Sequence, residues 1–372
     1  IVSRHDDFRA VVQNSRDYSN DLSLLEEVAN PPQEARDILK SGYSRPQTLQ
    51  RSDPPAHSRY RRVINRAFTA KRVRDMKPYI DRVVSDLIDE MIGAPEVDFV
   101  EAFATPLPCI VIADQMGVPR EDTDFIKEWT NALLDPVGLM ITDERNIECA
   151  RQTVEFQNYF AERIAERRDR PRDDILTDLV AEMDDDEAPL STEEVLNILE
   201  QLMTGGNETT TNTLSSALLL LIQNPEQERR LRDDPDLIPN FVEEVLRVET
   251  PVQGLFRRAV RDIEIRNVTI PKDAVVMVRH GAANRDESVF EDSEAFDVCR
   301  KNAGDHVTFG GGVHICPGRL LARAELNAAF TQLLDRFEKF ELVEEKNTFE
   351  YHPNFFLRGL NELHVRLTPK AA

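Results

Sequence analysis

The sequence predicts a mainly α-helical protein with a smaller β part, arranged as a single domain over residues 1–372. Three observations support this prediction. Apolar residues recur at helical spacing between 72 and 224, one helical segment from 191 to 224 is very long, and strand-like alternation is concentrated between 251 and 299. No internal repeat and no Gly/Ser-rich linker divides the chain.

Composition and charge narrow the class of protein. Hydrophobic residues make up 41% of the chain, as in an ordinary soluble globular protein. The net charge of −22 disfavours nucleic acid as a partner. The longest purely apolar run, 217–222, is too short to span a bilayer, so we expect no membrane anchor in this chain. The cysteines lack the spacing of a disulfide scaffold or a zinc site, which favours a cytoplasmic location: Cys109, Cys149, Cys299 and Cys316.

The N-terminal half is predicted to begin with a short strand-like piece and to continue as helices. The strand-like piece opens the stretch IVSRHDDFRAVV, residues 1–12. Asp53 and the two prolines after it predict the start of a helix in DPPAHSRYRRVINRAF. Amphipathic patterns predict helices within 72–92, 95–117 and 145–167. The acidic stretch 172–187 predicts a solvated loop.

The longest predicted helix has clear ends and an unfavourable middle. Ser191 and Glu194 have capping-box spacing, and Asn224-Pro225 ends the apolar pattern. At about 1.5 Å per residue this helix is about 50 Å long. Its middle, TGGNETTTNT, has low helix propensity, which leaves two interpretations. The helix either breaks into a loop or contains a bulge that opens a groove.

The β part follows this helix. The segment IEIRNVTIPKDAVVMV alternates apolar and polar residues around a Pro-Lys-Asp turn, so it predicts a hairpin or a small sheet. Helix resumes after Pro317.

One cysteine stands at the end of a glycine-rich loop in FGGGVHICPGRLLARAE, residues 309–325. A thiol at a helix N-terminus has a lowered pKa, and glycines let the backbone approach a flat ligand. This pattern suits a thiolate bound to haem iron. A structural cysteine in a glycine turn and a phosphate-binding loop remain alternatives, although no Lys-Ser or Lys-Thr follows the glycines. A zinc site made of His314 and Cys316 lacks further ligands close by.

The pattern Phe309-x-x-Gly312-x-His314-x-Cys316-x-Gly318 resembles the haem-binding signature of the cytochrome P450 superfamily, in its bacterial-type haem-thiolate form. The resemblance implies the P450 fold, with a long central helix crossing a haem b (iron protoporphyrin IX). It implies Cys316 as the axial iron ligand, the Phe309 ring near the sulfur, and His314 beside a haem propionate. It also implies that the family's N-terminal helix and first strands are absent before Ile1.

A second resemblance lies within the long helix. Gly205-Gly206-x-Glu208-Thr209 is similar to the oxygen-activation motif of the family. The resemblance implies Glu208 as proton conduit and Thr209 as the hydrogen-bonding alcohol beside bound dioxygen. Gly205 would leave room for the oxygen next to the haem.

The resemblance also implies residues that hold the haem propionates. His57 and Arg61 match the family's His-x-x-x-Arg, and Arg257 matches its second propionate arginine, with Arg258 as the competing choice. Taken singly, each could be a solvent-facing base.

Glu244 and Arg247 match the family's Glu-x-x-Arg, and Arg300 matches the arginine that joins it. The resemblance implies a structural charge network, whereas spacing alone would permit an ordinary surface ion pair.

Electrons are expected from outside the chain, because no flavin- or nicotinamide-type G-x-G-x-x-G follows a strand. We expect an acidic ferredoxin and its reductase, so that NAD(P)H acts only indirectly. A basic run without acids from 57 to 74, together with Arg319 and Arg323, would form the docking face. An exposed amphipathic helix pair is the alternative. The basic run comprises Arg59, Arg61, Arg62, Arg66, Lys71, Arg72 and Arg74.

The function expected from these motifs is that of a dioxygen-dependent monooxygenase acting on a mainly apolar small organic substrate. A peroxide-driven hydroxylase or a nitric-oxide reductase on the same fold, and a helical binding protein without haem, are the alternatives. Leu134, Val137 and Met140 are candidates for a lid. The candidate substrate-facing residues are Met203, Gly205, Val252, Gln253, Leu255, Phe355 and Phe356.

Overall fold

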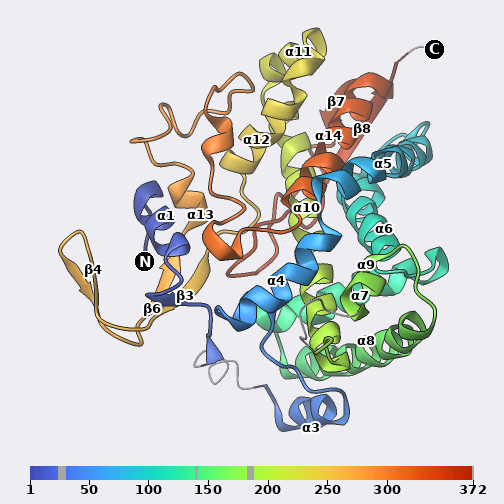
Figure 1. The fold of residues 1–372 in the computed structure, drawn as a ribbon. Helices are drawn as coiled ribbons and strands as arrows, with labels where there is room; N and C mark the ends of the chain where they lie inside the picture. Colours follow the sequence, from blue (N-terminus) through green and yellow to red (C-terminus); the bar gives the residue numbers. More distant parts are fainter. Residues whose placement is uncertain (24–30, 139–140, 182–187, 371–372) are drawn as a thin grey trace.

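The computed structural model describes residues 1–23, 31–138, 141–181 and 188–370 (Figure 1). Helices form most of it. They are α1 (His5–Gln13), α3 (Gln33–Ser41), α4 (Ala56–Ala67), α5 (Ala70–Met91), α6 (Pro106–Gln115), α7 (Thr123–Leu134), α8 (Asp143–Asp169), α9 (Ile175–Val180), α10 (Thr192–Gln223), α11 (Pro225–Asp233), α12 (Ile238–Val248), α13 (His280–Ala283) and α14 (Arg319–Arg336).

The strands are short and form small antiparallel sheets. They are β1 (Tyr18–Ser19), β2 (Val97–Asp98), β3 (Leu255–Ala259), β4 (Ile263–Ile265), β5 (Val268–Ile270), β6 (Val275–Val278), β7 (Phe337–Leu342) and β8 (His364–Pro369). Their order is β1-β3-β6 in one sheet and β2-β8-β7 in another, and β4 pairs with β5. A hairpin is therefore present in the predicted segment, but its turn is not at Pro-Lys-Asp, which instead connects β5 to β6 in different sheets. Arg266 and Asn267 make its two-residue turn with positive φ, as this kind of turn requires.

The central element is α10, which passes between the helices α5 to α9 and the part that carries α1, β3 and β6 (Figure 1). Its 32 residues begin with the predicted capping box. The backbone N–H of Glu194 donates to Ser191 Oγ, and the N–H of Ser191 donates to the Glu194 carboxylate. The helix ends at Gln223, immediately before Asn224-Pro225, as predicted.

The polar middle of α10 remains a regular α-helix, so both the predicted break and the predicted bulge are wrong. Its threonines compensate for their low propensity locally. The hydroxyls of Thr204, Thr209 and Thr213 each donate to the carbonyl four residues earlier, at 2.8 Å. Thr211 bonds the carbonyl of Ala104 at 3.0 Å, which fastens α10 to the start of α6. Tertiary contacts therefore override propensity here.

At the N-terminus the predicted short strand-like piece is the bridge from Val2 to Val278, and α1 follows it. Two further predictions about elements need correction. Within 95–117, α6 begins only at Pro106, after β2 and a π-helical turn at Val100–Ala104. The acidic stretch contains α9, whose buried apolar side chains pack inward. The part of that stretch from 182 to 187 lies outside the described residues.

The core consists of two large hydrophobic clusters joined by α10. One packs α5, α12 and α14 against the C-terminal half of α10 and the β7–β8 sheet. The other packs α4, α6, α7 and α8 against the N-terminal half. A third, smaller cluster lies between α1 and the sheet of β3 and β6.

Candidate active site

The loop that carries Cys316 is held in place by its backbone. The N–H of Cys316 donates to the carbonyl of Phe309 at 2.9 Å, which closes the loop immediately before α14. Gly310 and Gly312 have left-handed φ of 70° and 63°. A Cβ on Gly312 would lie 2.3 Å from the carbonyl oxygen of Val12, at the end of α1. Contact with α1 therefore explains Gly312 directly, apart from any ligand.

The sulfur of Cys316 lies in mixed electrostatic surroundings. Burial raises the pKa of Cys316 above its usual range, and this effect is the largest. The backbone N–H groups of Gly318 and Arg319 and the cations of Arg61 and Arg319 act in the opposite direction. A cation bound to the sulfur would outweigh burial, because a metal deprotonates a coordinating thiol. Among the residues that the structure describes, no cluster of three or more metal-ligating side chains exists.

Basic side chains converge beside this loop without an acidic partner. The rings of His57, from α4, and His314 lie 4.1 Å apart between centroids. The Nε2 atom of each is buried and lacks a hydrogen-bond partner. Arg257, from β3, is 7% exposed, and its guanidinium donates only to the Phe256 carbonyl, at 2.7 Å. Within the described parts of the chain, neither Arg257 nor Arg61 forms a salt bridge.

The pKa values reflect the cost of this crowding. Burial and the charge of Arg61 lower the pKa of His57. Burial, His57, Arg257 and Arg61 lower the pKa of His314 to about 3. Burial lowers the pKa of Arg257 to about 10, and the charge of Asp53 acts in the opposite direction. A buried cation without a salt bridge is unfavourable, so the site is complementary to an anionic group. The two carboxylates of a haem fit it.

The alternative choice, Arg258, points away from this cluster. Its guanidinium bonds Asp273 at 2.9 Å and the carbonyl of Asp21 at 3.2 Å. Consecutive residues of a strand face opposite sides, so only one of the two arginines can lie beside His314. The geometry selects Arg257.

Behind the loop lies a buried charge network. Arg247 donates to both oxygens of Glu244 at 2.7 and 2.8 Å, and Arg300 donates to Glu244 at 3.0 Å. Glu244 and Arg247 have no exposed surface. Arg247 also donates to the carbonyls of Ser293 and Ala295, so the network ties α12 to the long loop before the cysteine. These side chains are engaged with one another, as a structural role requires.

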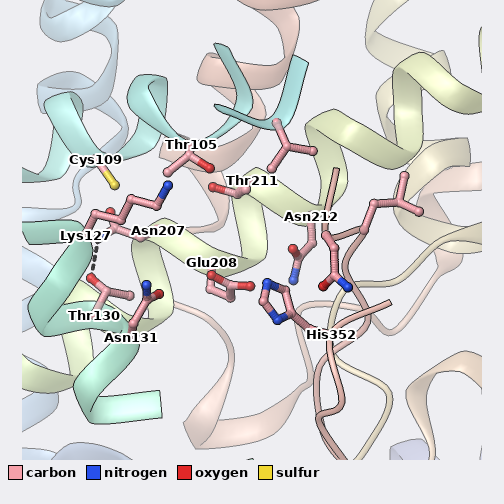
Figure 2. Close-up of a pocket in the computed structure, with 13 residues that line it drawn as sticks. Thr105, Cys109, Lys127, Thr130, Asn131, Asn207, Glu208, Thr211, Asn212 and His352 are labelled. Atoms are coloured by element: carbon pink, nitrogen blue, oxygen red, sulfur yellow. Dashed lines mark hydrogen bonds between the residues drawn. The ribbon is translucent and has the colours of Figure 1, made fainter. Parts of the chain in front are cut away.

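Glu208 and Thr209 are adjacent on α10 but do not share surroundings. Thr209 Oγ1 donates to the carbonyl of Gly205 at 2.8 Å. A Cβ on Gly205 would meet nothing within 4 Å, so the helix surface there is open. The Glu208 carboxyl projects into a cavity of about 100 Å³, shown in Figure 2, which Thr209 does not line.

The cavity at Glu208 is polar. Lys127 and Asn131 reach it from α7, Asn212 from α10, and His352 from the loop after β7 (Figure 2). Burial raises the pKa of Glu208, while the charge of His352 and the nearby side chain of Asn212 oppose that rise. A polar cavity of this volume can hold several water molecules.

Comparison with known proteins identifies the family. The model of the cytochrome P450 family matches residues 125–361. Cytochrome P450 107B1 of Saccharopolyspora erythraea is 37% identical over 316 residues, which cover 85% of this chain and 76% of the relative. The 6-deoxyerythronolide B hydroxylase of the same organism is 35% identical over 316 residues, covering 85% and 77%. The structure of CYP109E1 from Bacillus megaterium in complex with corticosterone superposes with a TM-score of 0.83 at 31% identity, covering 98% and 91%.

The chain belongs to the cytochrome P450 family. It is therefore an oxidoreductase of the monooxygenase type, its fold is the P450 fold, and the family implies a haem cofactor. Among the residues that the structure describes, no helix combines the length and apolar character needed to cross a bilayer.

Part of the predicted docking face of this P450 is occupied by internal ion pairs. Arg59 bonds Glu194 at 2.7 Å, and Arg72 bonds Asp178 on α9. Two of the cations in the basic run are therefore neutralised by acids from distant segments, which the local sequence could not reveal.

The remaining predicted cations differ in their surroundings. Arg319 donates to the carbonyl of Cys316 at 3.1 Å. Arg323 forms two bonds of 2.6 Å to Glu243. Arg62 and Arg66 are exposed on α4. Lys71 and Arg74 are exposed on α5. The exposed part of the basic surface therefore spans α4 and the start of α5.

The candidate substrate residues divide into two groups. Met203 is fully buried in the hydrophobic cluster between α4, α6 and α10, and its place facing substrate stays a prediction. Leu255 and Phe355 are 42% and 53% exposed. Phe355 and Phe356 pack against each other, with ring centroids 5.3 Å apart, and both pack against Phe256 on β3.

Backbone contacts place the remaining candidates. Val252 forms a strand-like bridge to Leu357, and the Gln253 N–H donates to the Phe356 carbonyl at 2.7 Å. The segment just before β3 therefore lies against the loop at 355–357.

The candidate lid lies near the same loop. Leu134 is partly buried, and Val137 is 42% exposed. A Cβ on Gly138 would lie 3.1 Å from the side-chain amide of Asn354. Met140 lies outside the described residues.

Sequence reasoning missed several residues of these sites. Asn212 could have been predicted from the sequence, because it follows Glu208 by four residues and so lies on the same helix face. Lys127 and His352 come from separate elements, and no local pattern marks them. Glu243 and His306 were missed because neither belongs to a family motif. Glu243 immediately precedes the motif that begins at Glu244, and His306 precedes the motif that begins at Phe309.

Proposed function

We propose that this P450 binds haem b through Cys316 and inserts one oxygen atom of dioxygen into a mainly apolar small organic substrate, by hydroxylation or epoxidation. The observation that carries the proposal is the partly buried thiol of Cys316 beside His57, His314 and Arg257, whose buried nitrogens form no salt bridge in the described parts of the chain. A ligand with both an iron and two carboxylates satisfies both features at once.

The haem would be held by residues from four segments. Cys316 would ligate the iron, with Phe309, Gly312 and Gly318 shaping the loop around it. Its propionates would lie against His57, Arg61, Arg257 and His314, and Gly205 would border its other face. When bound, the haem supplies the iron at which dioxygen is reduced and its O–O bond is cleaved.

The reaction consumes two electrons and two protons: substrate C–H, dioxygen, two protons and two electrons give the alcohol and one water. We assign the proton supply to Glu208 and Thr209. Burial raises the pKa of Glu208 toward neutral pH, and a group whose pKa lies near the working pH can both accept and release protons. The Thr209 hydroxyl donates to Gly205, so its oxygen can still accept a hydrogen bond on the open side of α10.

The need for this proton relay distinguishes a dioxygen-dependent enzyme from a peroxide-driven hydroxylase on the same fold. A peroxide-driven hydroxylase receives its oxygen already reduced, so it has less need of an acid and an alcohol at these positions. The presence of both Glu208 and Thr209 therefore favours dioxygen.

The exposed apolar side chains of Leu255, Phe355 and Val137 support a mainly apolar substrate. Contact with an apolar ligand would remove these side chains from water, which favours binding. Two of the similar proteins are named for small organic ligands: one is a 6-deoxyerythronolide B hydroxylase, and the structure of the other is a complex with corticosterone.

Electrons would come from an acidic ferredoxin and its reductase, with NAD(P)H as the indirect source. The exposed cations of α4, Arg62 and Arg66, support an acidic partner. All four cysteines are free thiols, which supports a cytoplasmic location.

The test is an optical titration of the purified ferric protein with terpenoids, aromatics, steroids and fatty acids, followed by turnover under ¹⁸O₂ with any compound that shifts the Soret band. We expect one compound class to shift the band toward high spin and one ¹⁸O atom in the product. A product that carries oxygen only from water or peroxide would overturn the proposal.

A further inference from the structure

The ring of Phe309 lies between the cysteine loop and a cation. Its own carbonyl accepts the Cys316 N–H, so ring and thiol belong to one rigid turn. The guanidinium carbon of Arg323, from α14, lies 4.5 Å from the centre of the Phe309 ring. A guanidinium over an aromatic face is favourable, and it places a full positive charge beside the cysteine loop.

Glu243 neutralises that charge. Its two carboxylate oxygens accept from Nε and a terminal nitrogen of Arg323, each at 2.6 Å. This paired geometry is the strongest form of an arginine–carboxylate bond, and it fixes the plane of the guanidinium. Burial alone would raise the pKa of Glu243, but Arg323 and His306 lower it to about 2, so the carboxylate stays ionised.

His306 completes the arrangement from the loop side. Its Nδ1 accepts the backbone N–H of Thr308 at 3.2 Å. The proton of the neutral ring must therefore be on Nε2, which donates to Glu243 at 3.2 Å. The His306 ring lies 5.6 Å from the Phe309 ring between centroids. Both partners of Glu243 thus contact Phe309.

We propose that Glu243 is a positioning residue that sets the reduction potential of the iron at Cys316, by holding Arg323 over Phe309 and cancelling its charge. The inference rests on the proposed ligation by Cys316. It separates two adjacent residues of α12: Glu244 belongs to the buried structural network, and Glu243 belongs to the electrostatics of the cysteine loop.

The sign of the effect follows from charge alone. Reduction from ferric to ferrous adds one electron, so a nearby positive charge favours the reduced form and raises the potential. Replacing Glu243 by Gln leaves Arg323 uncompensated and should raise it. Replacing Arg323 by Gln leaves the Glu243 carboxylate uncompensated and should lower it.

The experiment is a spectroelectrochemical titration of the haem-loaded protein and its variants. We expect Glu243→Gln to shift the ferric–ferrous equilibrium toward ferrous by about tenfold, which is 59 mV for one electron. Arg323→Gln should shift it in the opposite direction, and the double variant should return close to wild type.

Two variants control for other causes. Glu249→Gln removes a carboxylate just after α12 that accepts from Arg358 at 2.9 Å. This ion pair is separate from that of Glu243 and Arg323. The variant should leave the potential unchanged. Glu243→Asp keeps the charge and should also stay near wild type, so loss of packing is separated from loss of charge.

Shifts of the same sign in Glu243→Gln and Arg323→Gln, or no shift in either, would overturn the inference. If Glu243→Gln fails to bind haem, Arg323→Gln decides alone, because an unchanged or raised potential contradicts the charge argument. A wild-type protein whose ferrous–carbon monoxide spectrum lacks the thiolate band would instead overturn the proposed ligation by Cys316.

Discussion

At the scale of single residues, the structure separates groups that are neighbours in the sequence. Arg257 and Arg258 face opposite sides of β3, and Glu208 and Thr209 face different surroundings on α10. The motif identifies both members of each pair, but only the local backbone geometry decides which one faces the ligand.

The proposed role of Thr209 predicts uncoupling. Thr209→Ala removes the hydroxyl that would hold protons beside bound dioxygen, so electrons should be lost to peroxide. We expect product per NAD(P)H consumed to fall on the order of tenfold or more, with haem binding retained. Measuring product, peroxide and NAD(P)H together checks this.

Thr213→Ala is the matched control, because Thr213 makes the same bond to the carbonyl four residues earlier on the same helix. Coupling that stays intact in Thr209→Ala, or that falls equally in Thr213→Ala, would show that Thr209 has no special part in proton supply.

A buried carboxyl on α14 predicts a pH dependence of stability. Burial raises the pKa of Glu325 to about 8, and its Oε2 lacks a hydrogen-bond partner. In the unfolded chain Glu325 loses its proton near its ordinary pKa of 4.5, while the folded protein keeps it until about pH 8. Its contribution to stability is therefore fully present at low pH and is lost as the pH rises toward 8.

Glu325→Gln should remove this loss. Relative to wild type, the variant should gain at least about 1 kcal/mol in the free energy of unfolding between pH 5 and pH 8. Urea titrations at both pH values measure the difference. A constant difference between the two proteins at both pH values would show that Glu325 ionises normally in the fold.

At the scale of elements, the ends of α10 could be predicted because local chemistry defines them. A capping box and an Asn-Pro stop act within a few residues. The β structure of 263–278 was predicted from its alternation, but the turn of its hairpin lies at Arg266 and Asn267 and not at Pro-Lys-Asp. The middle of α10 and α9 could not be predicted. In α10, side-chain bonds to carbonyls and to Ala104 override propensity, and in α9 the acidic composition conceals a buried apolar face.

The network of Glu244, Arg247 and Arg300 joins α12 to the loop that carries Cys316, so it should be critical for folding. Glu244→Gln leaves Arg247 buried without its counter-charge, which should lower the free energy of unfolding by about 3–5 kcal/mol. Chemical denaturation monitored by circular dichroism measures this.

Asp81→Asn is the comparison, because it removes an exposed ion pair with Lys77 and should cost less than about 1 kcal/mol. Equal losses in the two variants would contradict the structural role of the buried network.

At the scale of the whole molecule, the charge distribution could be read only in part from the sequence. The basic run from 57 to 74 is continuous in sequence. In the folded chain, however, Arg59 pairs with Glu194 of α10 and Arg72 pairs with Asp178 of α9. The haem site was more accessible to prediction, because a few motifs fix its residues. The cavity beside Glu208 was not, since it joins α7, α10 and the 352 loop.

This distribution predicts where an acidic electron donor binds. Reversing the charges of Arg62 and Arg66 to Glu should raise the KM for a ferredoxin on the order of tenfold at low salt, and the difference should shrink as salt increases. Reversing Lys339 and Arg366, on β7 and β8, is the control and should have little effect. Equal responses in both pairs would place the donor elsewhere or make binding depend on net charge alone.

The central claim is that Cys316 supplies a thiolate to haem iron, and the carbon monoxide difference spectrum of the reduced protein tests it most directly. Wild type and Cys299→Ser, which alters an exposed cysteine, should both show the red-shifted Soret band of a thiolate-ligated haem. Cys316→His should bind haem without that band. A thiolate band that persists in Cys316→His, or that wild type lacks after haem is supplied, would contradict the account.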